Sequence, residues 1–340
     1  MGKKTTMQDI ADAVGVSRVT VWKALKNHQG VSERVRLQVR KAAQEMGYIS
    51  SGQELPAVQG SSGRTVSVIV SRPESSVFWT SIIHRAAKEL AKQQINLLYT
   101  YVPFSYKDEY RFPALLTDGT VSGAIILNVY DKEMLHLIDT LDIPKVYLDT
   151  VTAISPFELH GDVFLLEGYE SVKRLTGSIL DSGRTQLGFI GDIGYARTNH
   201  DRYAGFLAAF SERKLPIKQE YCLTSSLGVH DYYGRIADFM EKCQKMPQGF
   251  VCASDDVAFF LCQYLKEKGI RVPEDIVISG YDGFPEYENS TDFLTTVVVQ
   301  TSQLGKRLAR QLQYRIENSD AAYELTYINS PIRYGASTRG

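Results

Sequence analysis

Residues 6–48 read TMQDIADAVGVSRVTVWKALKNHQGVSERVRLQVRKAAQEMGY, and the organisation of the whole chain follows from them. The stretch contains three short helical patterns, each preceded by a hydroxyl side chain that can accept a hydrogen bond from the first helical turn. The expected caps are Thr6 with Asp9 as a capping box, Ser17 and Ser32, and the expected helix ends are Gly15 and Gly47.

Each pattern places apolar residues on one helical face, so the three helices can share a small core. These positions are Ile10, Ala11, Val14, Val21, Ala24, Leu25, Val35, Val39, Ala42, Ala43 and Met46. Two helices joined by a short turn that contains Gly form a helix-turn-helix. We therefore predict an all-α helix-turn-helix domain, the head, over residues 1–49.

The charge of the chain is divided unevenly. Residues 1–50 hold nine Lys and Arg against four Asp and Glu, a net charge of +5, whereas the whole chain carries −1 and the remainder therefore −6. A basic domain on an acidic body is typical of DNA binding. The alternative is a small helical bundle with a solvated basic face, and the helix caps favour the DNA-binding interpretation.

The totals exclude several classes of protein. A chain of 340 residues with 44% apolar content indicates two or three packed domains rather than a disordered protein. Its four cysteines form no Cys-x-x-Cys pair and have no His partners at metal-ligand spacing, so we expect free thiols in a reducing compartment. The sequence has no signal peptide pattern and no apolar run of about 18 residues. A cytoplasmic protein without membrane contact, metal or other cofactor is expected.

Residues 50–63, SSGQELPAVQGSSG, are rich in Gly, Ser and Pro and are predicted to be a linker or hinge. From Arg64 onward, short apolar strands alternate with helical patterns, which predicts parallel sheets. The expected strands are 65–70, 95–101, 122–127, 145–148, 186–190, 249–253, 276–280 and 295–299, with a final extended stretch over 323–332. The expected helices are 78–92, 107–116, 132–141, 167–181, 198–213, 255–268 and 303–318. Two α/β halves of similar size suggest two doubly wound lobes.

Ligands of open α/β sheets bind beyond the carboxyl ends of the strands. Polar residues that follow the expected strands are Ser71, Arg72, Asn128, Asp149, Asp192, Ser254, Asp255 and Asp282. If the lobes face each other, these residues line one cleft. Strand ends also need helix caps, so Asp255 is interpreted as an N-cap, while ligand contact and turn chemistry have equal weight for Asp282.

Aromatic residues gather near the same strand ends: Phe78, Trp79, Tyr195, Tyr203, Tyr281 and Phe284. A polar rim with aromatic walls suits a sugar-like molecule, because carboxylates and Arg bind hydroxyls while rings stack on apolar faces. Arg202 lies in the same region, and a solvated helix residue is the alternative for it. Phe206 and Phe210 are expected in the hydrophobic core.

The head sequence, with DRYAGF (residues 201–206), GIRVPEDIVISGYDGF (269–284) and LTTV (294–297) in that order, resembles the LacI/GalR family of transcriptional regulators. The resemblance spans nearly the whole chain. It implies a periplasmic-binding-protein-like core and a homodimer, in some members a tetramer, on double-stranded operator DNA. It also implies that the chain crosses between lobes near Asp162, Thr295 and Asn318, with lobe 1 over about 64–162 and 296–320 and lobe 2 over about 163–295 and 321–340.

The resemblance implies that the second helix of the head lies in the major groove. Arg18, Val19 and Lys23 match base-reading positions, and Val19 is suited only to a thymine methyl. Thr6, Ser17 and Thr20 match phosphate-contacting or capping positions. The sequence departs from the family at Trp22 and Lys26, where Ser and Asn are common, and at residues 49–52, which lack the usual Pro-Asn pair. Trp22 and Lys26 are still expected to contact DNA, with packing on the linker as the alternative to a backbone contact for Trp22. Either Leu55 replaces the usual minor-groove wedge, or the operator is bent less.

The resemblance also implies effector-binding residues. Arg202 and Asp282 match positions that contact the effector in the family, and Ser254 is at a position where many members have Asn. Asp149 and the Ser71–Arg72 corner match less closely. We expect a repressor whose operator affinity is controlled by a small molecule, with a sugar as the expected effector. A purine or a phosphorylated carrier protein is the alternative within the family.

Two further alternatives are a solute-binding protein and a sugar enzyme on the same core. An exported binding protein needs a signal peptide and has no use for a basic head. The sequence also contains no His-Glu-x-x-His motif and no phosphate-binding loop of the GxxxxGK[ST] type, which argues against an enzyme.

Overall fold

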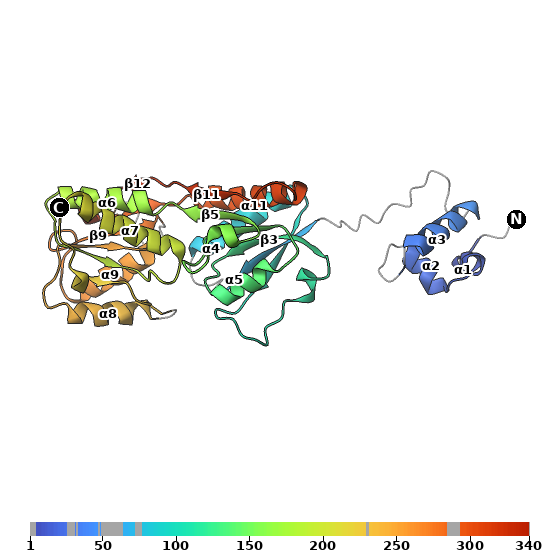
Figure 1. Ribbon diagram of the computed structural model, residues 1–340, viewed down its shortest axis with the longest axis horizontal. Helices are drawn as coiled ribbons and strands as arrows, with labels where there is room; N and C mark the ends of the chain where they lie inside the picture. Colours follow the sequence, from blue (N-terminus) through green and yellow to red (C-terminus); the bar gives the residue numbers. More distant parts are fainter. Residues whose placement is uncertain are drawn as a thin grey trace. The chain divides into compact units, whose positions relative to one another are not determined.

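The computed structural model describes residues 5–25, 31, 33–46, 48, 64–71, 77–228, 231–283 and 293–339, with 33, 34, 40 and 44 described by their backbone alone. The chain divides into two compact units, Met1–Gly63 and Arg64–Gly340. The first is helical and the second contains two sheets flanked by helices (Figure 1). The predicted linker over 50–63 and the predicted roles of Ser32 and Gly47 lie outside the described residues.

The head has the three predicted helices, α1 (Met7–Val14), α2 (Arg18–Leu25) and α3 (Glu33–Glu45). The Thr6 hydroxyl accepts from the Asp9 amide at 3.3 Å, and the Asp9 carboxylate accepts from the Thr6 amide at 2.7 Å, which confirms the capping box. Gly15 ends α1 with φ 72°, a conformation that favours glycine. The Ser17 hydroxyl accepts from the Thr20 amide at 3.0 Å, as an N-cap does.

The predicted apolar faces meet in one hydrophobic core of the head. Its fully buried residues are Ile10, Ala11, Val21, Ala24, Val39 and Ala43. All three helices contribute to this set, so the apolar periodicity in the sequence places the helices correctly. The outward side of α2 is left exposed to solvent.

Thr6→Ala should destabilise the head by about 1 kcal/mol, because the substitution removes the side-chain acceptor of the capping box. Thr6→Ser keeps that acceptor and should remain close to wild type. The chain has two tryptophans, so denaturant unfolding in a Trp79→Phe background can be followed by the fluorescence of Trp22. Equal unfolding midpoints for the Ala and Ser variants would show that the cap contributes nothing.

The second unit begins with lobe 1, whose sheet has the strand order β11-β5-β4-β3-β1-β2 and is parallel throughout. Its strands are β1 (Thr65–Val70), β2 (Asn96–Tyr101), β3 (Val121–Leu127), β4 (Lys145–Leu148), β5 (Asp162–Leu166) and β11 (Leu325–Ile328). Its helices are α4 (Val77–Ala91), α5 (Lys132–Asp139) and α11 (Thr301–Glu317).

Lobe 2 repeats the arrangement with the strand order β12-β10-β9-β8-β6-β7, parallel except for the terminal β12. Its strands are β6 (Leu187–Ile190), β7 (Cys222–Leu223), β8 (Gly249–Cys252), β9 (Val277–Asp282), β10 (Thr295–Val298) and β12 (Ile332–Arg333). Its helices are α6 (Tyr169–Asp181), α7 (Arg197–Glu212), α8 (Tyr232–Lys242) and α9 (Asp255–Glu267). The prediction of an α/β core with two doubly wound lobes is confirmed.

The crossings between lobes lie later in the chain than predicted. The chain leaves lobe 1 after Leu166, returns to it after Val298 and leaves it again after Ile328, rather than near Asp162, Thr295 and Asn318. The reason is strand pairing, because β5 completes its pairing with β4 and β11 in lobe 1 before the chain crosses. Residues 325–328 therefore belong to lobe 1.

Two other expectations are corrected. The predicted helix over 107–116 is only a 3₁₀ turn at Ala114–Leu116, because Pro113 lacks an amide hydrogen and disfavours a helix before it. The stretch 162–166 is a strand that the sequence prediction missed, since the four apolar residues after Asp162 suit a buried strand or a buried helix equally. Helix α8 was missed as well.

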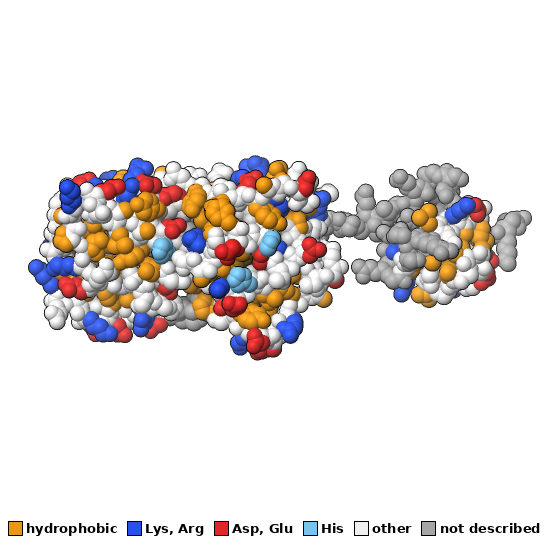
Figure 2. Space-filling view, viewed as in Figure 1, with side chains coloured by type: hydrophobic (Ala, Val, Ile, Leu, Met, Phe, Trp, Pro, Cys, Tyr) orange, Lys and Arg blue, Asp and Glu red, His pale blue; other side chains and the backbone are white. Residues whose placement is uncertain are grey.

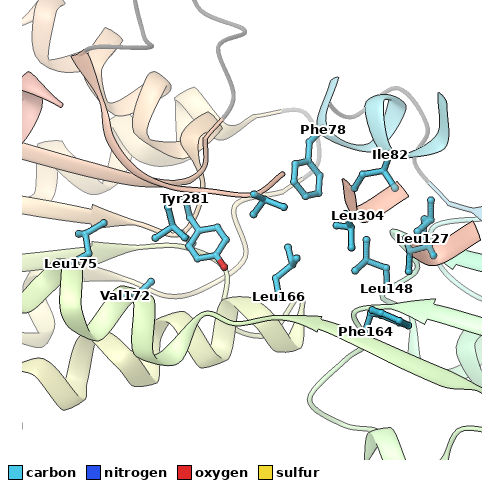
Figure 3. Packing of buried hydrophobic residues seen from close by; sticks show 14 of the residues in the cluster. Phe78, Ile82, Leu127, Leu148, Phe164, Leu166, Val172, Leu175, Tyr281 and Leu304 are labelled. Carbon is cyan, nitrogen blue, oxygen red and sulfur yellow. The ribbon is translucent and has the colours of Figure 1, made fainter. Parts of the chain in front are cut away.

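One hydrophobic cluster extends from lobe 1 into lobe 2. It includes Phe78, Phe164 and Leu304 in lobe 1, and Val172 and Tyr281 in lobe 2. Figure 3 shows Leu166, at the first crossing, between the two groups of side chains. The first crossing is therefore packed into the interior at Leu166, which is 4% exposed.

A buried ion pair joins α11 to β5 in lobe 1. The guanidinium of Arg315 donates to the carboxylate of Asp162 at 2.6 and 3.2 Å, and both side chains are at most 2% exposed. Asp162 also accepts from Gln311 and from the Glu324 amide, both at 2.8 Å. This carboxylate therefore joins α11, β5 and the start of β11.

Candidate functional site

The two lobes have their topological switch points at equivalent places. When the strands are numbered along the chain within each lobe, the first five lie side by side in the order 2-1-3-4-5. The direction of winding reverses between the first and third strands, and α/β folds bind ligands at that point. In lobe 1 the Ser71 hydroxyl, after β1, donates to the Asn128 carbonyl, after β3, at 2.5 Å. In lobe 2 the equivalent ends are Gly191 with Asp192 and Ala253 with Ser254.

Three of the predicted strand-end residues have left-handed backbone conformations. The φ angles are 54° at Asn128, 67° at Asp149 and 118° at Asp282. Asn and Asp tolerate this region better than most residues, but such conformations still cost free energy and cluster at functional sites. At these positions the conformation turns the chain directly at the carboxyl end of β3, β4 and β9.

Hydrogen bonds join the two lobes beside these strand ends. The Tyr195 hydroxyl donates to Asn128 Oδ1 at 3.1 Å. The Thr198 hydroxyl donates to Asp149 Oδ2 at 2.5 Å, and the Thr198 amide donates to Asp149 Oδ1 at 3.3 Å. The Arg197 amide donates to the Thr150 carbonyl at 2.7 Å. The start of α7 in lobe 2 is thereby attached to lobe 1, so a change in the angle between the lobes would break these bonds.

The carboxyl group of Asp149 is buried in this contact region. Burial raises its pKa above the usual range, and hydrogen bonds from Thr198 and Thr150 together with the nearby charge of Arg202 oppose that rise. The hydroxyl of Tyr130 lies 3.3 Å from Asp149 Oδ2, and burial, with a smaller effect of the Asp149 charge, raises the pKa of Tyr130 well above its usual value. The ionised carboxylate is therefore less favourable here than in water.

Asp149→Asn should raise the thermal midpoint relative to wild type at neutral pH, and this difference should vanish in acid. A raised folded-state pKa means that folding favours the protonated form, so the contribution of Asp149 to stability is lost as pH rises through that pKa. The side-chain carbonyl of Asn can still accept from the backbone amides of Thr150 and Thr198, which donate to Asp149 in wild type. Thermal midpoints of both proteins from about pH 4 to about pH 8 test this. A wild type that gains stability over the variant with rising pH would contradict the assignment.

Arg202 on α7 is 4% exposed and lies at the centre of the lobe 2 side of the site. Its Nη1 donates to the Ala253 carbonyl at 2.6 Å and to Asn199 Oδ1 at 3.2 Å. The guanidinium lies 3.6 Å from the centre of the Tyr281 ring. Nη2 is 3.9 Å from Asp282 Oδ1, beyond hydrogen-bond distance, and the buried Nε has no hydrogen-bond partner. Within the protein, Nε therefore has no hydrogen-bond partner, and Nη2 has only a long ion pair with Asp282.

A cavity of about 220 Å³ lies against the lobe 2 switch point. It is lined by Phe104, Gly191, Asp192, Tyr195, Asn199, Ser226, Leu227, Gly228, Tyr232, Ala253, Ser254 and Val257. The rings of Phe104 and Tyr195 are stacked with centres 6.5 Å apart, and Tyr130 lies 4.4 Å from Tyr195. Asn199 and Ala253 line the cavity and also accept hydrogen bonds from Arg202. Arg202 and its hydrogen-bond partners are therefore continuous with the cavity wall.

Seven of the predicted residues lie around the cavity and the contact between the lobes: Ser71, Asn128, Asp149, Tyr195, Arg202, Ser254 and Asp282. The other described aromatic residues predicted to line the site do not. Phe78 is a core residue of the interlobe cluster, and half-buried Trp79 packs against its ring at 5.1 Å. Tyr281 is fully buried under Arg202; its hydroxyl donates to the Glu167 carbonyl, and burial raises its pKa to about 12. Tyr203 packs against Phe189 and Phe206. Arg72 and Phe284 lie outside the described residues.

The cap of α9 is Ser254, whose hydroxyl accepts from the Val257 amide at 3.3 Å, rather than Asp255. Asp255 is the first residue of α9 and accepts from the Thr296 hydroxyl at 2.6 Å. The prediction of Asp255 as the N-cap is therefore wrong by one position. Both residues serve structure, and Ser254 also lines the cavity.

Sequence reasoning missed the residues that enter the site from places other than strand ends. Phe104 lies in the segment after β2, Tyr232 begins α8, and Thr198 and Asn199 lie in the first turn of α7. For Thr198 and Asn199, closeness in the sequence to Tyr195 and Arg202 was too weak a signal to select them. For Phe104 and Tyr232 the sequence offered no signal.

The described residues contain no group of His, Cys, Asp and Glu side chains that could hold a metal ion. Within the same part of the chain, no helix is long and apolar enough to cross a bilayer.

The second candidate site is the outward face of α2 in the head. Arg18, Val19 and Trp22 are exposed and Lys23 is half-buried. Acidic and basic side chains are interspersed over the visible face of the second unit (Figure 2), whereas the head has a net positive charge. Lys26 and Leu55, also predicted to contact DNA, lie outside the described residues.

Comparison with known proteins finds matches for both units of the chain. Residues 6–51 match the family described as bacterial regulatory proteins, lacI family, and residues 177–338 match a periplasmic binding protein-like domain. The HTH-type transcriptional repressor PurR of Vibrio parahaemolyticus is 26% identical over 317 residues, or 93% of each chain.

Two solved structures share the fold. The transcriptional regulator CelR in complex with cellobiose has a TM-score of 0.71 at 19% identity, covering 98% of this chain and 99% of that one. The lac repressor dimer bound to operator and the anti-inducer ONPF has a TM-score of 0.67 at 18% identity, covering 99% of both chains.

A helix-turn-helix head joined to a two-lobed, periplasmic-binding-protein-like core defines a class of DNA-binding transcriptional regulators. The chain belongs to the LacI family of bacterial regulatory proteins.

Proposed function

We propose that this protein is a transcriptional repressor that binds operator DNA as a homodimer and responds to a small molecule bound between its lobes. It has no catalytic role in this proposal. The observation that carries it is the contact between α7 and the strand ends of lobe 1, because Asn128 and Asp149 hold Tyr195 and Thr198 across the lobe boundary. A ligand that competes for these polar groups would favour one angle between the lobes.

The head supplies the DNA-binding part of the proposal. Its exposed Arg18 and half-buried Lys23 project from a helix of the size that enters the major groove. Thr6 and Ser17 form caps in the structure, and the Thr20 hydroxyl hydrogen-bonds to the Ser17 hydroxyl at 2.8 Å. Phosphate contact is the proposed second role of these three residues. A dimer would place two heads on a near-palindromic operator.

A sugar is the proposed effector. The polar groups around the cavity include Asp192, Asn199 and Arg202, and the aromatic rings include Tyr195 and Tyr232. This combination suits hydroxyl groups on an apolar ring face. CelR is described with cellobiose, which supports a sugar, while the relatives named PurR keep a purine as the alternative. We propose that the sugar weakens operator binding; a corepressor would use the same contacts with the opposite sign.

A thermal-shift screen of the full chain against sugars, nucleobases and nucleosides tests the effector class, because binding to the native state raises the midpoint. A sugar that raises the midpoint in wild type but not in Arg202→Ala supports the proposal. A purine that does so would replace the sugar. Binding to random duplex DNA that does not weaken with added salt would contradict the DNA-binding role of the head.

A further inference from the structure

The outward face of α2 is apolar at its centre. Val19 is 60% exposed and Trp22 is 41% exposed, whereas Val21 and Ala24 on the opposite face are fully buried in the core of the head. Residues three positions apart on a helix are neighbours, so Val19 and Trp22 form one apolar surface. Helix α2 therefore has apolar residues on two faces, one buried in the core of the head and the other partly exposed to solvent.

Positive charges flank this surface. Arg18 is four positions before Trp22 and Lys23 is four positions after Val19, so each cation lies beside an apolar residue on the helix. Because the head has a net positive charge, its electrostatic complement is a polyanion. The apolar group that the major groove of DNA presents is the 5-methyl group of thymine. A surface with cations beside apolar residues is therefore complementary to a major groove in which guanine edges or phosphates lie next to the methyl group of thymine.

We propose that Val19 and Trp22 together bind thymine methyl groups, so that each operator half-site holds thymines next to the bases addressed by Arg18 and Lys23. The inference rests on the proposed DNA-binding function and adds its base preference. Val19 has the size to cover one methyl group. The indole of Trp22 offers a larger apolar area and makes the larger contribution.

The test begins with selection of binding sites from a library of random duplex DNA by the full chain. Deoxyuridine then replaces thymidine one position at a time in the selected duplex, which removes only the methyl group. Burial of one such group is worth about a fourfold change in affinity. Wild type should lose about this factor at two or more thymines in each half-site, and Trp22→Ala and Val19→Ala should each lose sensitivity at one or more of these positions.

Two variants control for folding and for general apolar contact. Leu37→Ala changes a side chain that is 68% exposed on α3, outside the proposed reading surface, and should keep the full sensitivity to deoxyuridine. Trp22→Leu retains an apolar side chain at this position and should keep part of the sensitivity to deoxyuridine. Thermal midpoints of all variants establish that the head is folded.

The failures are distinguishable. If no sequence is enriched, the proposed DNA-binding function fails. If a site is enriched but deoxyuridine has no effect, or has the same effect in Trp22→Ala and Val19→Ala as in wild type, the thymine inference fails while DNA binding stands. If Trp22→Ala weakens every duplex equally, Trp22 contacts the DNA backbone or another part of the chain, and the inference is overturned.

Discussion

Arg315→Met should destabilise the second unit by about 3–5 kcal/mol, because it leaves the buried carboxylate of Asp162 without its counter-charge. The carboxylate is 0% exposed and would keep only the bonds from Gln311 and the Glu324 amide. Asp162→Ala should cost a similar amount, since it leaves the Arg315 guanidinium buried. Denaturant unfolding followed by circular dichroism measures both changes.

The double variant and a second ion pair of α11 are the controls for this prediction. Replacing Arg315 by Met and Asp162 by Leu together removes both charges and should recover a large part of the lost stability. Arg310, also on α11, forms an ion pair at 2.8 Å with Glu89 of α4, but the Arg310 side chain is 56% exposed. Without Arg310, Glu89 would keep its ion pair with Lys92 at 2.6 Å. Arg310→Met should therefore cost less than about 1 kcal/mol. Equal losses for Arg310→Met and Arg315→Met would mean that burial does not set the strength of the ion pair.

Arg202→Ala should abolish the effector response while leaving operator binding by the head intact. Nε of Arg202 has no protein hydrogen-bond partner and Nη2 has only a long ion pair with Asp282, so we propose these two groups as the donors to the effector. Charge-assisted hydrogen bonds contribute about 1.5–3 kcal/mol each, so the loss of two should weaken effector binding by on the order of a hundredfold or more. Calorimetric titration with the effector found by the screen measures this affinity.

Asp201→Asn is the matched control, because Asp201 is on the same helix and pairs with His200 at 3.6 Å rather than with the site. This variant should bind the effector like wild type. Arg202→Lys keeps the charge but loses the planar guanidinium over Tyr281, and should retain only part of the affinity. Full effector affinity in Arg202→Ala would remove Arg202 from the site.

Much of the fold follows from local patterns in the sequence. The capping box of Thr6 and Asp9 and the left-handed Gly15 are short-range features, so the residues themselves specify them. The crossings between lobes are different. Residues 163–166 are apolar and could form a strand or part of a helix, and only pairing with β4 and β11 assigns them to lobe 1.

The candidate site divides in the same way. Asn128, Asp149 and Asp282 could be predicted because carboxyl ends of parallel strands converge on one edge of a sheet. Thr198, Tyr130 and Phe104 could not, because their positions depend on how one lobe packs on the other. Tyr281 follows a strand pattern that buries it, and its ring supports Arg202 instead of facing the cavity.

The central claim is that occupancy of the site between the lobes changes the affinity of the head for DNA. The direct measurement is an anisotropy titration of a labelled operator duplex, obtained by selection, with and without saturating effector. In wild type the effector should change the dissociation constant by about fivefold or more. In Arg202→Ala the constant should stay at the effector-free value. An effector that binds wild type but leaves its operator affinity unchanged, or changes both proteins equally, would contradict the account.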